Sequence, residues 1–143
     1  MKKLKLVLDS NIWIGYFLGQ HIRKYLDQIL IDTRFDLLIS QQEIDELTLV
    51  LKRPKFQKYI NAEQIETLIS LILRRSIVIE VSSQIALSRD PKDDYLLALS
   101  IDGHADYLIT GDKDLLVLEQ FEQTIIMKIV DFIAKYYWYI KYA

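Results

Sequence analysis

The chain has 143 residues, 51% of them hydrophobic, and no apolar run reaches the ~20 residues that a membrane-spanning helix needs, so a single globular domain over residues 1–143 is expected. Its formal net charge of −2 excludes binding of nucleic acid through overall charge, although a local basic patch or a bound cation can still attract phosphate groups. The absence of cysteine excludes disulfides and thiolate metal sites, and it fits a reducing, cytoplasmic compartment.

The first predicted element is a buried strand at residues 4–9, in LKLVLD. The basic start of the chain followed by this apolar run is similar to a weak signal peptide. However, Asp9 interrupts the run and no small-residue cleavage site follows, which favours the strand. Ser10 can cap a helix that begins near Asn11, and a second helical pattern covers about 20–31.

The second predicted strand lies at residues 34–40, in RFDLLIS. Ser40 and Glu43 then form an S-x-x-E capping box, in which each side chain satisfies a backbone amide of the other residue. This box predicts a long helix through about Lys52. The same capping pattern at residues 61–64 predicts the start of the next helix.

The third predicted strand lies at residues 76–81 and precedes a helix with clear end signals. Asp90 can cap this helix, Pro91 suits its first position, and Gly103 fits the C′ position just past its end. The remaining elements are a strand at 106–111, a short helix near 113–120, a strand at 124–130 and a terminal helix or tail in DFIAKYYWYIKYA.

Short buried strands that alternate with helices predict an α/β fold, with a central parallel sheet of about five strands covered on both faces. Ligand sites in such sheets lie beyond the carboxyl ends of the strands. Acids just past the predicted strands are expected to meet there, namely Asp9, Glu46, Asp94 and Asp112. Because clustered carboxylates repel one another, this placement indicates a bound cation.

Two of these positions leave alternatives. Glu43 has a sufficient reason in the capping box, so Glu46, one helical turn further along the same face, is favoured for the site. In RDPKDD, Asp90 suits the helix cap, and Asp93 suits the positive end of the helix dipole. Asp94 is therefore favoured, and Asp93 and Asp90 remain the alternatives.

Further side chains near these acids have supporting roles in the prediction. Asn11 can hydrogen-bond and orient a neighbouring carboxylate, and Thr110 can donate its hydroxyl to a carboxylate or water. Asp114 is an accessory acid, and Gly111 permits an unusual backbone angle after the strand. Asp112 could alternatively serve only as the cap of the short helix.

Three segments, LVLDSNIWI, LLISQQEIDELTLVLKRPKF and RDPKDDYLLALSIDGHADYLITGDKDLL, resemble the PIN-domain family, and within it the VapC-like toxins of toxin–antitoxin pairs. The resemblance covers nearly the whole chain and implies an α/β/α sandwich. It also implies Mg²⁺ or Mn²⁺ binding, cleavage of single-stranded RNA, an antitoxin whose tail occupies the active site, and frequent dimers. The family's acidic set falls on Asp9, Glu46, Asp94 and Asp112, with Asp114 as an occasional extra.

The function expected from these residues is that of a metal-dependent endoribonuclease. Asp9, Asp94 and Asp112 would hold the main ion, and Glu46 would help to hold a metal or orient the attacking water. One alternative is a haloacid dehalogenase-like phosphatase, which would need a second Asp where Asn11 stands. Another is a non-catalytic RNA- or protein-binding module. The aromatic C-terminal segment is expected to pack on the core or a dimer face, or to contact a partner.

Overall fold

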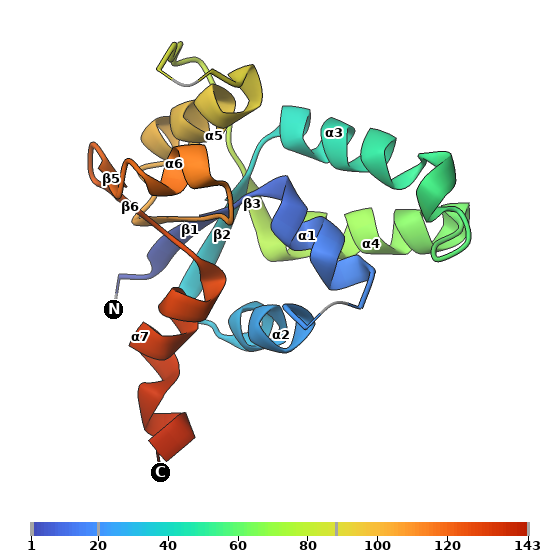
Figure 1. Ribbon diagram of the computed structural model, residues 1–143, viewed down its shortest axis with the longest axis horizontal. Helices are drawn as coiled ribbons and strands as arrows, with labels where there is room; N and C mark the ends of the chain where they lie inside the picture. The colour runs from blue at the N-terminus through green and yellow to red at the C-terminus, as the bar shows by residue number, and fades with distance from the viewer. Residues whose placement is uncertain (1, 20, 88, 143) are drawn as a thin grey trace.

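Strands and helices alternate along the chain, as Figure 1 shows. The computed structural model describes residues 2–19, 21–87 and 89–142, with side chains as far as Tyr137. The elements in chain order are β1 (Leu4–Leu8), α1 (Ser10–Phe17), α2 (Arg23–Ile31), β2 (Phe35–Ile39), α3 (Gln41–Leu51), the 3₁₀ turn η1 (Pro54–Phe56), α4 (Ala62–Arg75), β3 (Ser76–Val78), α5 (Pro91–Asp102), β4 (Tyr107–Ile109), α6 (Lys113–Leu116), β5 (Gln120–Phe121), β6 (Thr124–Met127) and α7 (Ile129–Tyr142).

The sheet has six strands within the described residues, in the order β3-β2-β1-β4-β6-β5. All neighbouring strands pair in parallel except β5, which runs antiparallel to β6. The predicted α/β fold around a central parallel sheet is therefore confirmed. Because β1 lies between β2 and β4, the carboxyl ends of these three strands meet at one edge of the sheet.

β5 is the strand that the sequence did not predict. The short helix expected near 113–120 ends at Leu116, and β5 forms a tight hairpin with β6. Glu119 and Glu122 beside this hairpin have φ angles of 62° and 53°. Such left-handed angles are most readily adopted by Gly or Asn, and neither residue occurs there, so the turn has no signal in the sequence.

Helices cover both faces of the sheet and give it three layers. Alternate side chains of β1 face opposite ways: Leu6 and Leu8 join one core cluster, and Val7 joins the other. The first cluster contains residues of α1, α2, α3, α4 and α7, and the second contains residues of α5 and α6. Figure 1 shows α5 and α6 on one side of the sheet and α2 and α7 on the other.

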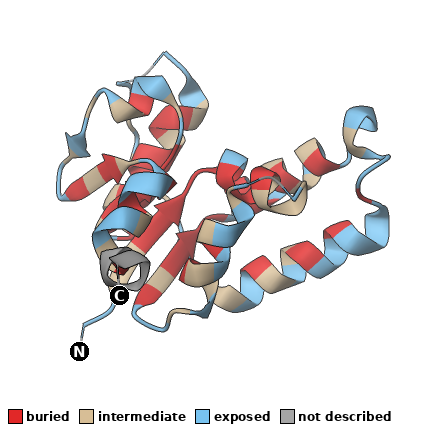
Figure 2. Ribbon diagram, turned by 60° about the horizontal axis from the view of Figure 1, so that its bottom comes forward, coloured by how far each residue is buried: buried red, intermediate tan, exposed pale blue. Residues whose placement is uncertain are grey.

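Helices α3 and α4 extend past the sheet as a paired arm, with η1 at its far end (Figures 1 and 2). The predicted capping box at the start of α4 is confirmed, because Asn61 and Gln64 exchange hydrogen bonds of 2.8 Å in both directions. Buried leucines, including Leu47 and Leu68, line the arm and continue the first core cluster.

The C-terminal segment forms α7, whose aromatic side chains pack on the sheet. The rings of Phe132 and Tyr136 contact each other and those of Phe35 and Tyr107. The centroids of the contacting rings lie 4.7–5.8 Å apart. This confirms the expected packing on the core for the first two turns of the helix, and the aromatic side chains after Tyr137 lie outside the described residues. Neither α7 nor any other helix in the described chain is long and apolar enough to cross a membrane.

Three predicted backbone details are wrong. Asp9, not Ser10, is the N-cap of α1. Gly103 has a φ of −89°, and the left-handed residue after α5 is His104, with a φ of 53°. Packing instead favours Gly103, because a Cβ atom there would lie 2.6 Å from Leu38 Cδ1 and 3.1 Å from the Leu99 carbonyl oxygen. Gly111 is not among the described glycines with a positive φ, so its expected special angle is absent.

Candidate active site

Asp9 lies at the centre of the candidate site, at the carboxyl end of the central strand β1. Its side chain is 2% exposed, and its two oxygens accept different hydrogen bonds. The Thr110 hydroxyl donates to Oδ2 at 2.8 Å, and the Asn11 backbone amide donates to Oδ1 at 3.2 Å. The orienting bond from Asn11 thus comes from its backbone, while its side chain is exposed.

Thr110 links the two acids that follow β1 and β4. It is fully buried, and its hydroxyl oxygen also accepts a 3.0 Å bond from the Asp112 backbone amide. Asp112 caps α6, since its Oδ1 accepts from the Asp114 amide at 2.8 Å. Capping therefore uses one carboxylate oxygen of Asp112 and leaves the other to face the site.

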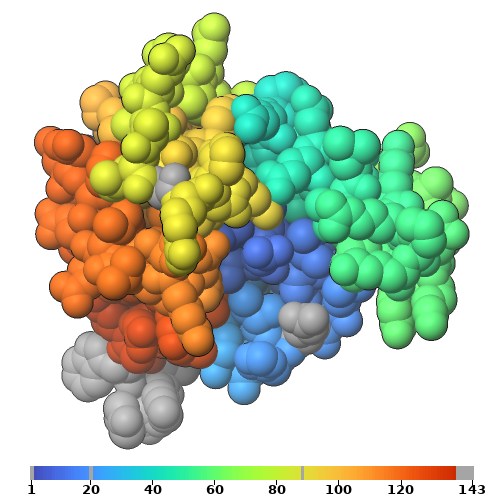
Figure 3. Space-filling view, turned by 45° about the horizontal axis from the view of Figure 1, so that its top comes forward, coloured from blue at the N-terminus to red at the C-terminus, as the bar shows by residue number. Residues whose placement is uncertain are grey.

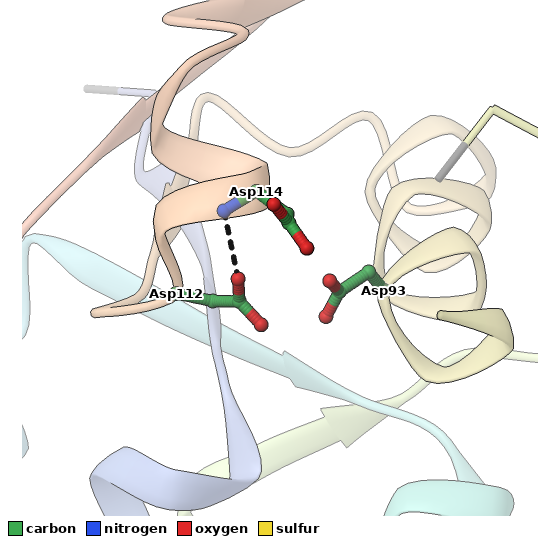
Figure 4. Close-up of side chains that lie close together, drawn as sticks. All are labelled: Asp93, Asp112 and Asp114. Carbon is green, nitrogen blue, oxygen red and sulfur yellow. Dashed lines mark hydrogen bonds between the residues drawn. The ribbon is translucent and has the colours of Figure 1, made fainter. Parts of the chain in front are cut away.

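Three carboxylates face one another between α5 and α6 (Figure 4). One ligand oxygen from each of Asp93, Asp112 and Asp114 lies within 4.8 Å of the others. Burial of Asp93, followed by the charge and hydrogen bonding of Asp112 and the charges of Asp90 and Asp9, raises the Asp93 pKa to about 7. These interactions place Asp9 in the same electrostatic cluster.

Asp94, which the sequence favoured over Asp93, points to a different part of the surface. Its Oδ1 accepts a 3.0 Å hydrogen bond from the Leu87 amide, and it lines a pocket with Ser83 and Ile85. Adjacent residues on a helix point about 100° apart, so only one of two consecutive acids can face the strand ends. In this fold that residue is Asp93.

Glu43 and Glu46 both line a pocket of about 210 Å³, together with Lys92 and Tyr95. The predicted capping box at Glu43 is wrong: Ser40 caps α3, but both Glu43 carboxylate oxygens are buried and have no hydrogen-bond partner among the described residues. Burial first, and then the charges of Asp9 and Glu46, raise the pKa of Glu43 well above its ordinary value.

Glu46 lies at the rim of this pocket and pairs with Lys92, whose Nζ is 2.8 Å from Glu46 Oε1. The sequence prediction overlooked Lys92. Its position could have indicated a role in the site. Lys92 is the second residue of α5, where a cation meets the positive end of the helix dipole and needs a nearby negative charge. The capping pattern also excluded Glu43 from the predicted site, although Glu43 and Glu46 line the same pocket.

The donor set fits a hard divalent cation. An orphaned, buried carboxylate such as Glu43 is costly unless a proton or a cation balances it. The facing carboxylates of Asp93 and Asp112 have the same need. Carboxylate oxygens with no sulfur or histidine nearby are the ligands that Mg²⁺ or Mn²⁺ prefers.

The first part of the chain, which carries Asp9, reaches the surface between the α3 and α5 regions. In Figure 3 the first part of the chain (blue) is exposed in the angle between the α3 region (teal) and the region around α5 (yellow). Arg89, just before α5, pairs with Asp114 across a distance of 3.1 Å, so positive charge also stands at this edge.

Solved structures of similar fold include three from different organisms. VapBC2 from Rickettsia felis, bound to a DNA fragment from its promoter, has a TM-score of 0.57 and 15% identity, and the match covers 86% of this chain and 97% of that chain. FitAcB from Neisseria gonorrhoeae has a TM-score of 0.56 and 15% identity, with 87% of this chain and 98% of that chain covered. PAE2754 from Pyrobaculum aerophilum has a TM-score of 0.56 and 16% identity, with 94% of this chain and 97% of that chain covered. No curated protein matches the chain. The model of the PIN domain matches residues 5–114, a span that includes every acid of the candidate site. The chain therefore belongs to the PIN domain family.

Proposed function

We propose that the protein is a metal-dependent endoribonuclease that hydrolyses phosphodiester bonds of single-stranded RNA, and that it acts as the toxin of a toxin–antitoxin pair. The observation that carries this proposal is the convergence of Asp9 and Asp112, which follow the adjacent strands β1 and β4, with Asp93 in the first turn of α5 and with the orphaned Glu43 beside Asp9. Membership of the PIN domain family and the fold shared with VapBC2 support it.

Asp9, Asp93 and Asp112 would hold the divalent ion, with Asp114 as an accessory ligand. Asp93 replaces Asp94 in this assignment, because Asp94 faces the segment around Leu87. When bound, Mg²⁺ or Mn²⁺ would supply charge neutralisation at the phosphate and a lowered pKa for a coordinated water. The ion itself could be either metal, since both accept oxygen ligands.

The chain's own residues would orient the reacting groups. Thr110 fixes the rotamer of Asp9 by bonding to Oδ2, and it fixes the Asp112 backbone through its second hydrogen bond. Glu46, at the rim of the pocket, would orient the attacking water, as its exposure allows a water to reach it. No histidine lies among these groups, so the carboxylates would carry the proton.

The partners we propose are RNA, a cognate antitoxin and a second copy of the chain, all in the cytoplasm. A structure of similar fold, VapBC2, was determined with promoter DNA. An antitoxin tail with a basic side chain could enter the acidic site, because its cation would balance the clustered carboxylates.

The deciding experiment compares wild-type protein with Asp9→Asn, Asp93→Asn and Asp94→Asn. We expect Mn²⁺ to raise the melting temperature of the wild type, EDTA to reverse this, and Mn²⁺ to support cleavage of single-stranded RNA. Asp9→Asn and Asp93→Asn should lose both effects, whereas Asp94→Asn should keep the Mn²⁺ stabilisation and serves as the matched control.

Other outcomes would point elsewhere. If no divalent ion stabilises the wild type and no RNA is cut, the protein is a non-catalytic binding module. An aspartyl-phosphate on Asp9, trapped with a fluoride analogue, would indicate the phosphatase instead. If Asp94→Asn loses Mn²⁺ binding while Asp93→Asn retains it, the ligand assignment must be reversed.

A further inference from the structure

Lys92 lies within the acidic site, where its ammonium group pairs with a carboxylate of the site. It is the second residue of α5, its side chain is 33% exposed, and its Nζ lies 2.8 Å from Glu46 Oε1. The same side chain lines the pocket that Glu43 and Glu46 share. The negative charges that act on its ammonium group are those of Glu46, Asp9 and Asp90.

This position is unfavourable for a lysine on local grounds. In the first turn of α5 the ammonium group meets the positive end of the helix dipole, which repels a cation. The neighbouring first-turn residues, Asp93 and Asp94, are acids, as that dipole favours. A cation here is therefore explained by the tertiary site and not by the helix.

The acids of the site divide into two groups. Asp93, Asp112 and Asp114 each place one ligand oxygen within 4.8 Å of the others, and Asp9 acts on the same cluster. Glu46 is not part of this cluster, and the ammonium group of Lys92 lies at hydrogen-bonding distance from its carboxylate. A divalent ion on Glu46 would have to displace the ammonium group and would then place two cations close together, which is costly.

We propose that Lys92 Nζ occupies the position that a second metal ion takes in two-metal nucleases, so that this site binds one divalent ion, and that Lys92 also contacts a phosphate oxygen of the RNA. The inference rests on the proposed function. In two-metal sites the paired ions stabilise the attacking and leaving oxygens. A lysine can supply one of those charges, because its ammonium group is a compact point charge that binds phosphate well.

Isothermal titration with Mn²⁺ tests the stoichiometry without any measurement of cleavage. The wild type should bind one ion. Lys92→Ala should bind two, because the freed Glu46 and Glu43 carboxylates form a second site, and Lys92→Ala combined with Glu46→Gln should return to one. Lys92→Arg keeps a cation and should also bind one. Thermal melting of each variant in EDTA verifies that it is folded.

Binding of a short single-stranded oligouridine in EDTA tests the phosphate contact. Loss of one contact should reduce the slope of log Kd against log salt by about 0.7 in Lys92→Ala. The matched control is Lys55→Ala, since Lys55 lies in η1 at the far end of the α3–α4 arm and should leave both the stoichiometry and the slope unchanged.

The results separate this inference from the proposed function. Two ions in the wild type, or one ion in Lys92→Ala, would overturn the role of Lys92 and leave the nuclease proposal intact. An unchanged salt slope in Lys92→Ala would overturn the phosphate contact. No Mn²⁺ binding by the wild type would overturn both proposals together.

Discussion

The Thr110 hydroxyl donates a 2.8 Å hydrogen bond to Asp9 Oδ2, which joins two residues separated by 101 positions in the chain. Both side chains are buried, and they lie at the ends of adjacent parallel strands. The bond fixes the rotamer of the central acid before any ion arrives, so the site is partly organised by the fold alone.

Thr110→Val tests this organisation, because valine keeps the shape of threonine and removes its hydroxyl. We expect Mn²⁺ affinity to fall about 10–100-fold, which is the usual effect of removing a residue that hydrogen-bonds to a metal ligand. The unfolding free energy should fall by about 1–3 kcal/mol, because buried polar atoms of Asp9 and Asp112 lose a partner. Thr110→Ser, which retains the hydroxyl, is the control. Equal Mn²⁺ affinity in both variants would show that the bond has no part in ion binding.

Metal affinity should depend on pH through Asp93, whose pKa is raised to about 7 by burial and then by the nearby acids. An ion must displace this proton, so Mn²⁺ binding should strengthen as the pH rises through about 7 and should release a proton. Titration calorimetry in buffers of different ionisation enthalpy measures the proton release. Asp93→Asn should bind Mn²⁺ too weakly to release a measurable proton; a wild type without proton release would contradict the shifted pKa.

Glu43→Gln should stabilise the metal-free protein, and more so at higher pH. The pKa of Glu43 is raised above its ordinary 4.5 by burial and then by Asp9 and Glu46, so the folded state holds its proton more tightly than the unfolded state. Stability is therefore lost as the pH rises above about 4.5, and glutamine removes that loss. Denaturant midpoints in EDTA at acidic and mildly alkaline pH measure the difference. Glu46→Gln is the control and should show no gain, since it leaves Lys92 unpaired.

Acid should weaken the contact between α2 and α7 through Asp32. The Arg34 guanidinium, 2.7 Å away, lowers the pKa of Asp32 to about 2 against the effect of burial, and the Tyr137 hydroxyl donates to the same carboxylate at 2.6 Å. A depressed carboxyl pKa stabilises the fold above the ordinary 3.8, and this contribution is lost as the pH falls through about 2.

Asp32→Asn measures that contribution by chemical denaturation. It should cost about 1 kcal/mol at neutral pH, a value discounted because 46% of the Arg34 side chain is exposed and screened by solvent. The exposed pair of Lys3 and Asp36, at 3.6 Å, gives the comparison, and Asp36→Asn should change stability by much less. Similar losses in the two variants would exclude a special role for the Asp32 contact.

The strands and the edge where the acids gather were predictable, because both follow from local patterns. Alternating apolar segments indicate buried strands, and parallel strands place the residues after them at one edge. Asp9 comes directly after β1 and Asp112 comes shortly after β4, which ends at Ile109, so no knowledge of helix rotation is needed to place them.

The acids on helices were harder to predict, since their direction depends on how each helix rotates against the sheet. Leu96, Leu97 and Leu99 are all buried, so the sequence of α5 marks no narrow apolar stripe from which to fix that rotation. The choice between Asp93 and Asp94 therefore requires the packed structure. Glu43 fits a capping box locally, but its carboxylate turns instead toward Asp9, from a distant part of the sequence.

The pairing of β1 with β4, in which Leu6 lies beside Tyr107, also sets when the acids meet during folding. Such non-local pairing forms slowly, because about a hundred residues of chain must first be ordered into a closed loop. The carboxylates therefore come together only as the native sheet closes. An ion that needs ligands from both strands should thus slow unfolding and leave the folding rate almost unchanged.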